Sequence, residues 1–182
     1  MLWPFNHFRK PHFAPRGTID AIYGMIVTQA REPLFYRDLG VPDTVNGRFD
    51  LIVLHLWMVL RRLGGVAGLT GLAQALFDRF CADMDDNLRE MAIGDLAVPK
   101  KMQAFGEAFY GRIAAYDMAL GDNPEALAQA ISRNILDGGD IENGRRLAAY
   151  ARAVIAALEE LDASALTHAS WAFPSPQLEA AT

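Results

Sequence analysis

Apolar side chains recur at three- and four-residue steps through most of this sequence, a spacing that places them on one face of an α-helix. Six segments show the pattern, at about 18–30, 45–63, 70–91, 98–120, 124–135 and 142–161. No stretch shows the two-residue alternation that is typical of a half-buried strand. The pattern therefore predicts an all-α fold, a single helical-bundle-like domain of about six helices.

The predicted domain covers residues 18–162, and both ends of the chain fall outside it. Thr18 is predicted to cap the first helix, since its side chain can accept a hydrogen bond from a free backbone N–H. Residues 1–17 contain three prolines and are predicted to form an irregular arm. Residues 163–182 lose the helical pattern, and Pro174 and Pro176 indicate a mostly unstructured tail.

The segment 45–63 is apolar around nearly its whole circumference, which is typical of a helix at the centre of its domain. His55 lies within it, and we interpret this side chain as a hydrogen-bonded core residue rather than a metal ligand. An alternative use of such a helix is a constitutive dimer interface, in which case the protein is a structural oligomeric subunit.

Composition narrows the classes of function. The chain has 182 residues, of which 52% are hydrophobic and 21% charged, as in one folded globular domain. Its net charge of −5 argues against general nucleic-acid binding and against ribosome binding, because phosphate contacts need positive charge. The single cysteine, Cys81, excludes an internal disulfide and fits a reducing compartment. The sequence has no apolar run of the roughly 20 residues that span a bilayer, and its beginning does not resemble a secretory signal.

Charged and aromatic residues gather in the two helical segments on either side of a short linker at 93–99. Because a short linker folds the second helix back antiparallel to the first, their side chains are expected to form one surface or one polar seam. Which of the two forms depends on burial. The candidate residues are Asp83, Asp85, Asp86, Arg89, Glu90, Lys100, Glu107, Phe109, Tyr110, Arg112 and Tyr116.

Catalytic and metal sites find little support in the same stretch. Asp83, Asp85 and Asn87 have the spacing of a calcium loop, but Leu88 replaces the required glycine and Gly94 the required glutamate. Glu-x-x-His pairs, a phosphate-binding loop and a nucleophile elbow are missing from the sequence. We therefore predict no enzyme activity, no metal and no cofactor. The alternative is a small helical ligand- or cation-binding protein, or an enzyme, that uses the carboxylates of 83–90 and Glu107.

The order of residues in this stretch resembles the ubiquinol–cytochrome c chaperone family. The similarity follows D-x-D-x-x-L-R-E at 83–90, then Gly94-Asp95 and Val98-Pro99-Lys100, then F-Y-G-R-x-x-A-Y at 109–116. Upstream residues agree with it, and the resemblance extends over roughly Ile19 to Leu120. These upstream residues are Tyr23, Ala30, Arg31, Tyr36, His55, Trp57, Arg61, Arg62 and Leu63.

The resemblance implies an all-helical, non-enzymatic assembly factor. Mitochondrial members bind newly made cytochrome b near the ribosomal tunnel exit, act with a small partner protein, and promote assembly of the bc1 complex. The size and alanine content of this chain are typical of a bacterial protein. We accordingly expect an assembly chaperone that binds newly made cytochrome b, or another hydrophobic subunit of the bc1 complex, with a small helical protein as a possible partner. Its expected location is the cytoplasm, or peripherally the inner face of the bacterial plasma membrane, with the charged and aromatic candidates contacting the client.

Overall fold

The computed structural model describes residues 16–90 and 97–176, and these residues form eight helices and no strand. This confirms the all-α fold and the six helices predicted from the apolar pattern. The two additional helices, α2 and α8, have only five residues each. The bounds are α1 (Arg16–Ala30), α2 (Pro33–Arg37), α3 (Val45–Gly64), α4 (Thr70–Glu90), α5 (Val98–Leu120), α6 (Pro124–Ile135), α7 (Ile141–Glu159) and α8 (Ala163–Thr167).

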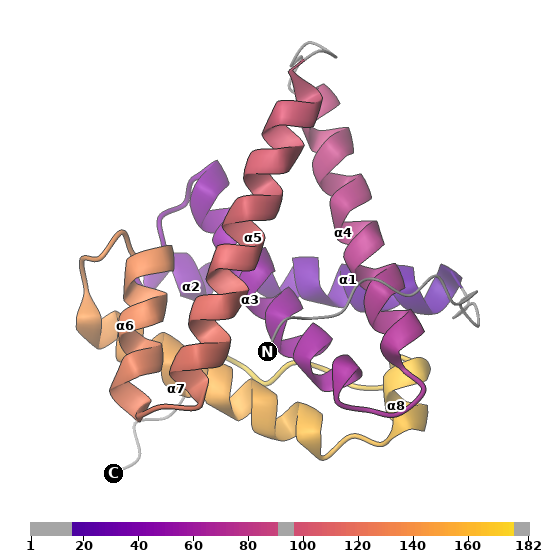
Figure 1. The fold of residues 1–182 in the computed structure, drawn as a ribbon. Coiled ribbons are helices and arrows are strands. Elements are labelled where there is room, and N and C mark those ends of the chain that lie inside the picture. Colours follow the sequence, from indigo (N-terminus) through magenta and orange to yellow (C-terminus); the bar gives the residue numbers. More distant parts are fainter. Residues whose placement is uncertain (1–15, 91–96, 177–182) are drawn as a thin grey trace.

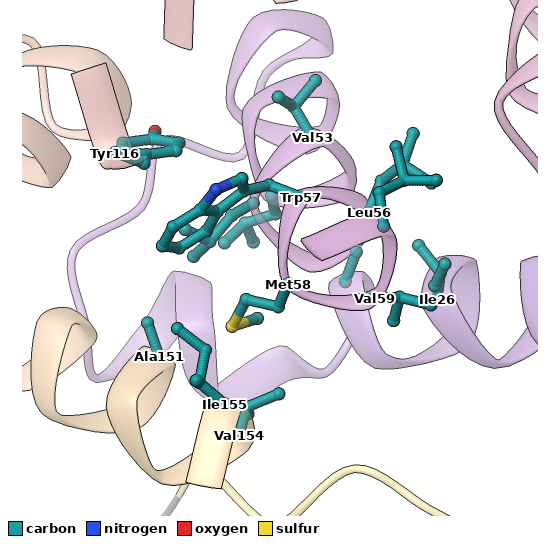
Figure 2. Packing of buried hydrophobic residues seen from close by; sticks show 14 of the residues in the cluster. Ile26, Val53, Leu56, Trp57, Met58, Val59, Tyr116, Ala151, Val154 and Ile155 are labelled. Atoms are coloured by element: carbon teal, nitrogen blue, oxygen red, sulfur yellow. The ribbon is translucent and has the colours of Figure 1, made fainter. Parts of the chain in front are cut away.

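Helix α3 lies at the centre and packs against α1, α4, α5, α6 and α7 (Figure 1). Its side chains point to different neighbours: Trp57 toward Tyr116 of α5, Met58 toward α7, and Val59 toward Ile26 of α1 (Figure 2). Every residue from 53 to 60 is buried. Because the rest of the chain covers residues 53–60, this part of α3 is not accessible for the alternative of a dimer interface.

Two glycines are required by close packing. The side chain of Thr44 caps α3 by accepting a hydrogen bond from the Gly47 N–H, and a Cβ at Gly47 would lie 2.0 Å from the Pro42 carbonyl oxygen. A Cβ at Gly144 would lie 2.8 Å from the Ala128 carbonyl oxygen. The first glycine therefore allows the tight start of α3, and the second lets α7 approach α6 closely.

The interior of the body, which we define as α1, α2, α3, α6, α7 and α8, contains a chain of hydrogen-bonded polar groups around His55. The Nδ1 of His55 is 2.7 Å from the Leu51 carbonyl, and its Nε2 is 2.9 Å from the Tyr150 hydroxyl. Since a carbonyl can only accept, Nδ1 carries the proton and Nε2 accepts from Tyr150. Gln29 then donates to the same hydroxyl at 3.0 Å. His55 is a hydrogen-bonded core residue, as the sequence predicted.

Both ends of the predicted domain differ from expectation. Helix α1 begins at Arg16, so Thr18 is not its cap, and the Thr18 hydroxyl donates instead to the Thr167 carbonyl at 3.0 Å. The part of the predicted tail at 163–176 contains α8 and packs on the core, with the Phe173 ring centroid 5.2 Å from that of His55. Prolines prevent a longer helix there, but not burial. The predicted arm at 1–15 and the tail beyond 176 lie outside the described residues.

Helices α4 and α5 form a hairpin that rises from the body, and the two helices converge toward its tip (Figure 1). Aromatic rings fill the space between the helices. Phe49 of α3 packs against Phe105 with ring centroids 5.0 Å apart, and Phe109 packs against Phe77 and Phe80 at 4.9 and 5.5 Å. We call these five rings the aromatic cluster.

Candidate functional site

The hairpin contains all the residues that the sequence singled out, but it places them in three different environments. Some are buried in the interior, one lines a groove between α1 and α4, and the rest lie on the exposed surface. The distinction left open by the sequence, between a recognition surface and a polar lock, is therefore resolved residue by residue.

Phe109 and Tyr116 belong to the interior. Phe109 is part of the aromatic cluster and is 2% exposed, while Tyr116 is fully buried with its ring 5.2 Å from that of Trp57. Burial and the neighbouring Asp50 carboxylate raise the pKa of the Tyr116 phenol, so it stays neutral. Neither side chain is accessible to a partner in this conformation, and both connect the hairpin to the core.

Arg112 connects α5 to α3 through a charge pair that the sequence analysis did not identify. Its guanidinium lies 2.7 Å from a carboxylate oxygen of Asp50 and 5.7 Å from the centre of the Phe49 ring. Burial raises the pKa of Asp50 to about 6, although the positive charge of Arg112 opposes the shift. The available signal was a lone carboxylate within an otherwise apolar helix, because such a group requires a partner when it is buried.

A second connection between the same helices involves Asp117. Its carboxylate accepts from the indole N–H of Trp57 at 2.9 Å and forms an ion pair with Arg61 at 3.2 Å. Asp117 therefore holds the C-terminal part of α5 against the C-terminal half of α3. Together with Arg112 and Asp50, it fixes the orientation of the hairpin relative to the body.

Asp83 lies in a groove between α1 and α4 with a volume of about 550 Å³. It accepts a hydrogen bond from the Tyr23 hydroxyl at 2.9 Å, and Arg79 lies 3.5 Å from it. Arg79 also pairs with Asp20 at 3.1 Å and stacks over the Tyr23 ring at 4.8 Å. Burial, and then the negative charge of Asp83, raise the pKa of Tyr23. These contacts hold α1 against the hairpin.

The remaining candidates lie on the surface. Asp85 and Arg89 pair with each other one turn apart on α4 at 2.6 Å, and Gln103 donates to Glu107 at 2.9 Å on α5. Tyr110 is 48% exposed. The other exposed candidates are Asp86, Glu90 and Lys100. These side chains are accessible to a partner, whereas Phe109, Arg112 and Tyr116 have structural roles.

The described residues contain neither a cluster of metal ligands nor a helix able to span a membrane. In the ranges 16–90 and 97–176, three or more histidine, cysteine, aspartate or glutamate side chains do not come together as metal ligands would. Within the same ranges, none of the helices combines the length and hydrophobicity needed to cross a bilayer.

Comparison with known proteins shows which family this chain belongs to. The model of the ubiquinol–cytochrome c chaperone family matches residues 37–173, three quarters of the chain. The chain belongs to this family. The match includes the hairpin and extends through the segment that contains α8 and Phe173.

Related proteins agree with the family match. The ubiquinol–cytochrome c reductase complex assembly factor 1 of Xenopus laevis is 29% identical over 132 residues, which are 70% of this chain and 66% of the relative. The mitochondrial protein CBP3 of Saccharomyces cerevisiae is 31% identical over 108 residues, 57% of this chain and 32% of the relative. This member of the chaperone family thus spans between about a third and two thirds of the length of these relatives.

A solved structure confirms the fold of this family member. The crystal structure of the Cbp3 homolog from Brucella abortus superimposes with a TM-score of 0.82 and is 36% identical in sequence. The superposition covers 91% of this chain and 94% of the other. It therefore extends beyond the range of the family model.

Proposed function

We propose that this protein is an assembly chaperone of the cytochrome bc1 complex that binds newly made cytochrome b. The observation that carries the proposal is the family match over residues 37–173. The names of the relatives support it, since the Xenopus and Drosophila relatives are named as assembly factors of the ubiquinol–cytochrome c reductase complex. The chaperone covers the apolar surface of the client until other subunits of the complex cover it. This role requires binding but no catalysed reaction.

The proposal places the protein at the inner face of a bacterial plasma membrane, where a newly inserted cytochrome b presents its cytoplasmic side. A small helical partner protein is a further proposed component of the complex, by analogy with the family. The net charge of −5 argues against direct ribosome binding. The cation-binding alternative has less support, because Asp83 and Asp85 are already paired with Tyr23, Arg79 and Arg89.

Deletion of the gene in its own organism tests the proposal. We expect the deletion strain to lose assembled bc1 complex, measured by native gel and by haem b absorbance, and a plasmid copy of the gene to restore it. Cytochrome oxidase serves as the control, because a general defect in membrane insertion would lower both complexes. A normal amount of bc1 complex in the deletion strain would refute the proposal.

A further inference from the structure

The groove between α1 and α4 lies where these two helices pack against each other (Figure 1) and has a volume of about 550 Å³. Its lining residues are Asp20, Tyr23, Gly24, Val27 and Arg31 of α1, with Arg79, Asp83 and Asn87 of α4. Along α1 the lining extends over about 16 Å, at 1.5 Å per residue. A Cβ at Gly24 would meet no atom within 4 Å, so the groove has room for a further side chain at this position.

Negative charge is in excess on the α4 side of this groove. The carboxylates of Asp20 and Asp83 both pair with one guanidinium, that of Arg79. Asp86 lies three residues after Asp83 on the same side of α4, is exposed, and forms no ion pair with a residue of 16–90 or 97–176. The second cation of the lining, Arg31, is exposed and also forms no ion pair within these ranges. A complementary occupant therefore has positive charge along α4 and an aromatic ring at Arg31.

The beginning of this chain has that chemistry and is attached beside the groove. Residues 1–15 lead into α1 at Arg16, one turn before Asp20. They contain Arg9 and Lys10 but no aspartate or glutamate. They also contain the aromatic residues Trp3, Phe5, Phe8 and Phe13, whose rings gain free energy when they leave water. Position and charge thus favour the chain's own first residues as the occupant.

The reach of this segment agrees with its charge. Pro15 immediately precedes α1, and proline is typical of turns, so the chain can reverse its direction there. An extended chain spans about 3.3 Å per residue, so five residues cover the groove along α1. With Phe13 at the end formed by Asp20, Lys10 comes level with Asp86, and Phe8 comes level with Arg31.

We propose that residues 8–13 bind in the groove between α1 and α4, antiparallel to α1. Arg9 and Lys10 pair with the carboxylates along α4, and the ring of Phe8 stacks on the Arg31 guanidinium, as the ring of Tyr23 does on Arg79. The bound segment connects the start of the chain to the base of the hairpin. The same segment of a second copy is the competing occupant, and the experiment distinguishes the two.

Photo-crosslinking of the purified full-length protein identifies what residues 8–13 contact. A benzophenone amino acid at Phe8 is expected to crosslink within one chain to the tryptic peptide 80–89 of α4, identified by mass spectrometry. This peptide is distant from Phe8 in the sequence, so the product requires contact in space. A crosslinked dimer on a denaturing gel, a product with other segments alone, or no product within the chain would each contradict the proposal.

Filling the groove should displace the segment. Gly24→Leu places a side chain in the groove, and Gly111→Leu is the matched control at an exposed glycine of α5 whose added Cβ also meets no atom within 4 Å. Leucine is a better helix former than glycine, so both variants are expected to melt no lower than the wild type. We expect Gly24→Leu to lower the yield of the crosslink about fivefold and the control to leave it unchanged. Equal yields in the two variants would overturn the proposal.

Charge reversal in the segment itself tests the pairing without altering the folded helices. Arg9→Glu combined with Lys10→Glu is expected to lower the crosslink yield about fivefold at low salt, and addition of Asp86→Lys should restore part of it. A yield that is insensitive to the reversal would refute the pairing with α4. These measurements involve the purified protein alone, so their failure is distinguishable from a failure of the proposed chaperone function.

Discussion

The body of the molecule and the α4–α5 hairpin use their polar groups differently. The body packs aliphatic residues around α3 and the rings of Phe35, Tyr150 and Phe173 around His55, and both ring nitrogens of this buried histidine have hydrogen-bond partners. The hairpin packs the aromatic cluster, and it is joined to α3 by the ion pair of Asp50 with Arg112 and by the bonds of Asp117. Polar groups in the body satisfy one another's hydrogen bonds inside the core. Those at the base of the hairpin fix the orientation of the hairpin relative to the body.

This difference indicates how the two regions respond to change. Loss of a central apolar side chain leaves a cavity that close-packed neighbours fill only in part, so it should affect the whole domain. Loss of a polar contact at the base of the hairpin leaves a specific group without its partner, and the penalty depends on which group remains. The predictions below test this distinction.

The largest effect is expected for Trp57→Ala, which removes a fully buried ring between α3 and α5. The variant loses the packing on Tyr116 and the hydrogen bond to Asp117, and we expect a decrease of about 4 kcal/mol in the free energy of unfolding. Urea denaturation measures this value. Trp57→Phe is the control, since it retains most of the ring and should lose less than half as much. Equal losses in the two variants would contradict the importance of packing here.

Removal of one charge at the base of the hairpin is expected to lower the free energy of unfolding more than removal of both charges. Arg112→Met leaves Asp50 buried without its partner, and we expect a loss of about 3 kcal/mol. The double variant Asp50→Leu, Arg112→Met replaces the pair with apolar groups and should recover most of that loss. Urea denaturation of the single and double variants provides the comparison. A double variant as unstable as the single one would show that the pair itself stabilises the hairpin.

The sequence predicted the body and the helices better than it predicted the polar contacts. Apolar periodicity located the six long helices because it depends on neighbours in the same helix, and α3 was correctly placed at the centre. The same reasoning could not pair Arg112 with Asp50 or Trp57 with Asp117, since the partners are about 60 positions apart and nothing local links them. Short helices such as α8 also escaped detection, because a five-residue segment shows too little of the period.

Acid conditions should reveal opposite contributions of His55 and Asp50, two buried groups, to the free energy of unfolding. Burial lowers the pKa of His55 from 6.5 to about 4, so its contribution to stability is present above pH 6.5 and is lost as the pH falls toward 4. Asp50 behaves oppositely: its pKa is raised from 3.8 to about 6, so its protonation favours the folded state as the pH falls through this range.

Asp50→Asn removes the second contribution and leaves the first. We expect the free energy of unfolding of this variant, relative to the wild type, to fall by about 1.4 kcal/mol for each pH unit between 6 and 4. Urea denaturation at half-unit steps of pH measures both proteins. Parallel curves for variant and wild type would mean that Asp50 titrates in the folded protein as it does in the unfolded chain.

A smaller effect is expected where the hairpin meets α1. Tyr23→Phe removes the hydroxyl that donates to Asp83 but retains the ring beneath Arg79, so we expect a loss of about 1 kcal/mol. Hydrogen exchange should rise locally in α1 and α4 while α7 stays protected. Uniformly faster exchange across all three helices would contradict a local role for this contact.

The smallest effect on stability is expected for the exposed charges of α4. Asp85→Asn breaks the pair with Arg89, which lies on the surface one turn away, and should change the free energy of unfolding by less than about 0.5 kcal/mol. The same variant tests whether this charged surface contacts the client, as the sequence proposed. Reduced bc1 assembly without reduced stability would support a contact between the client and the exposed charges of α4. Normal assembly in Asp85→Asn would contradict such a contact.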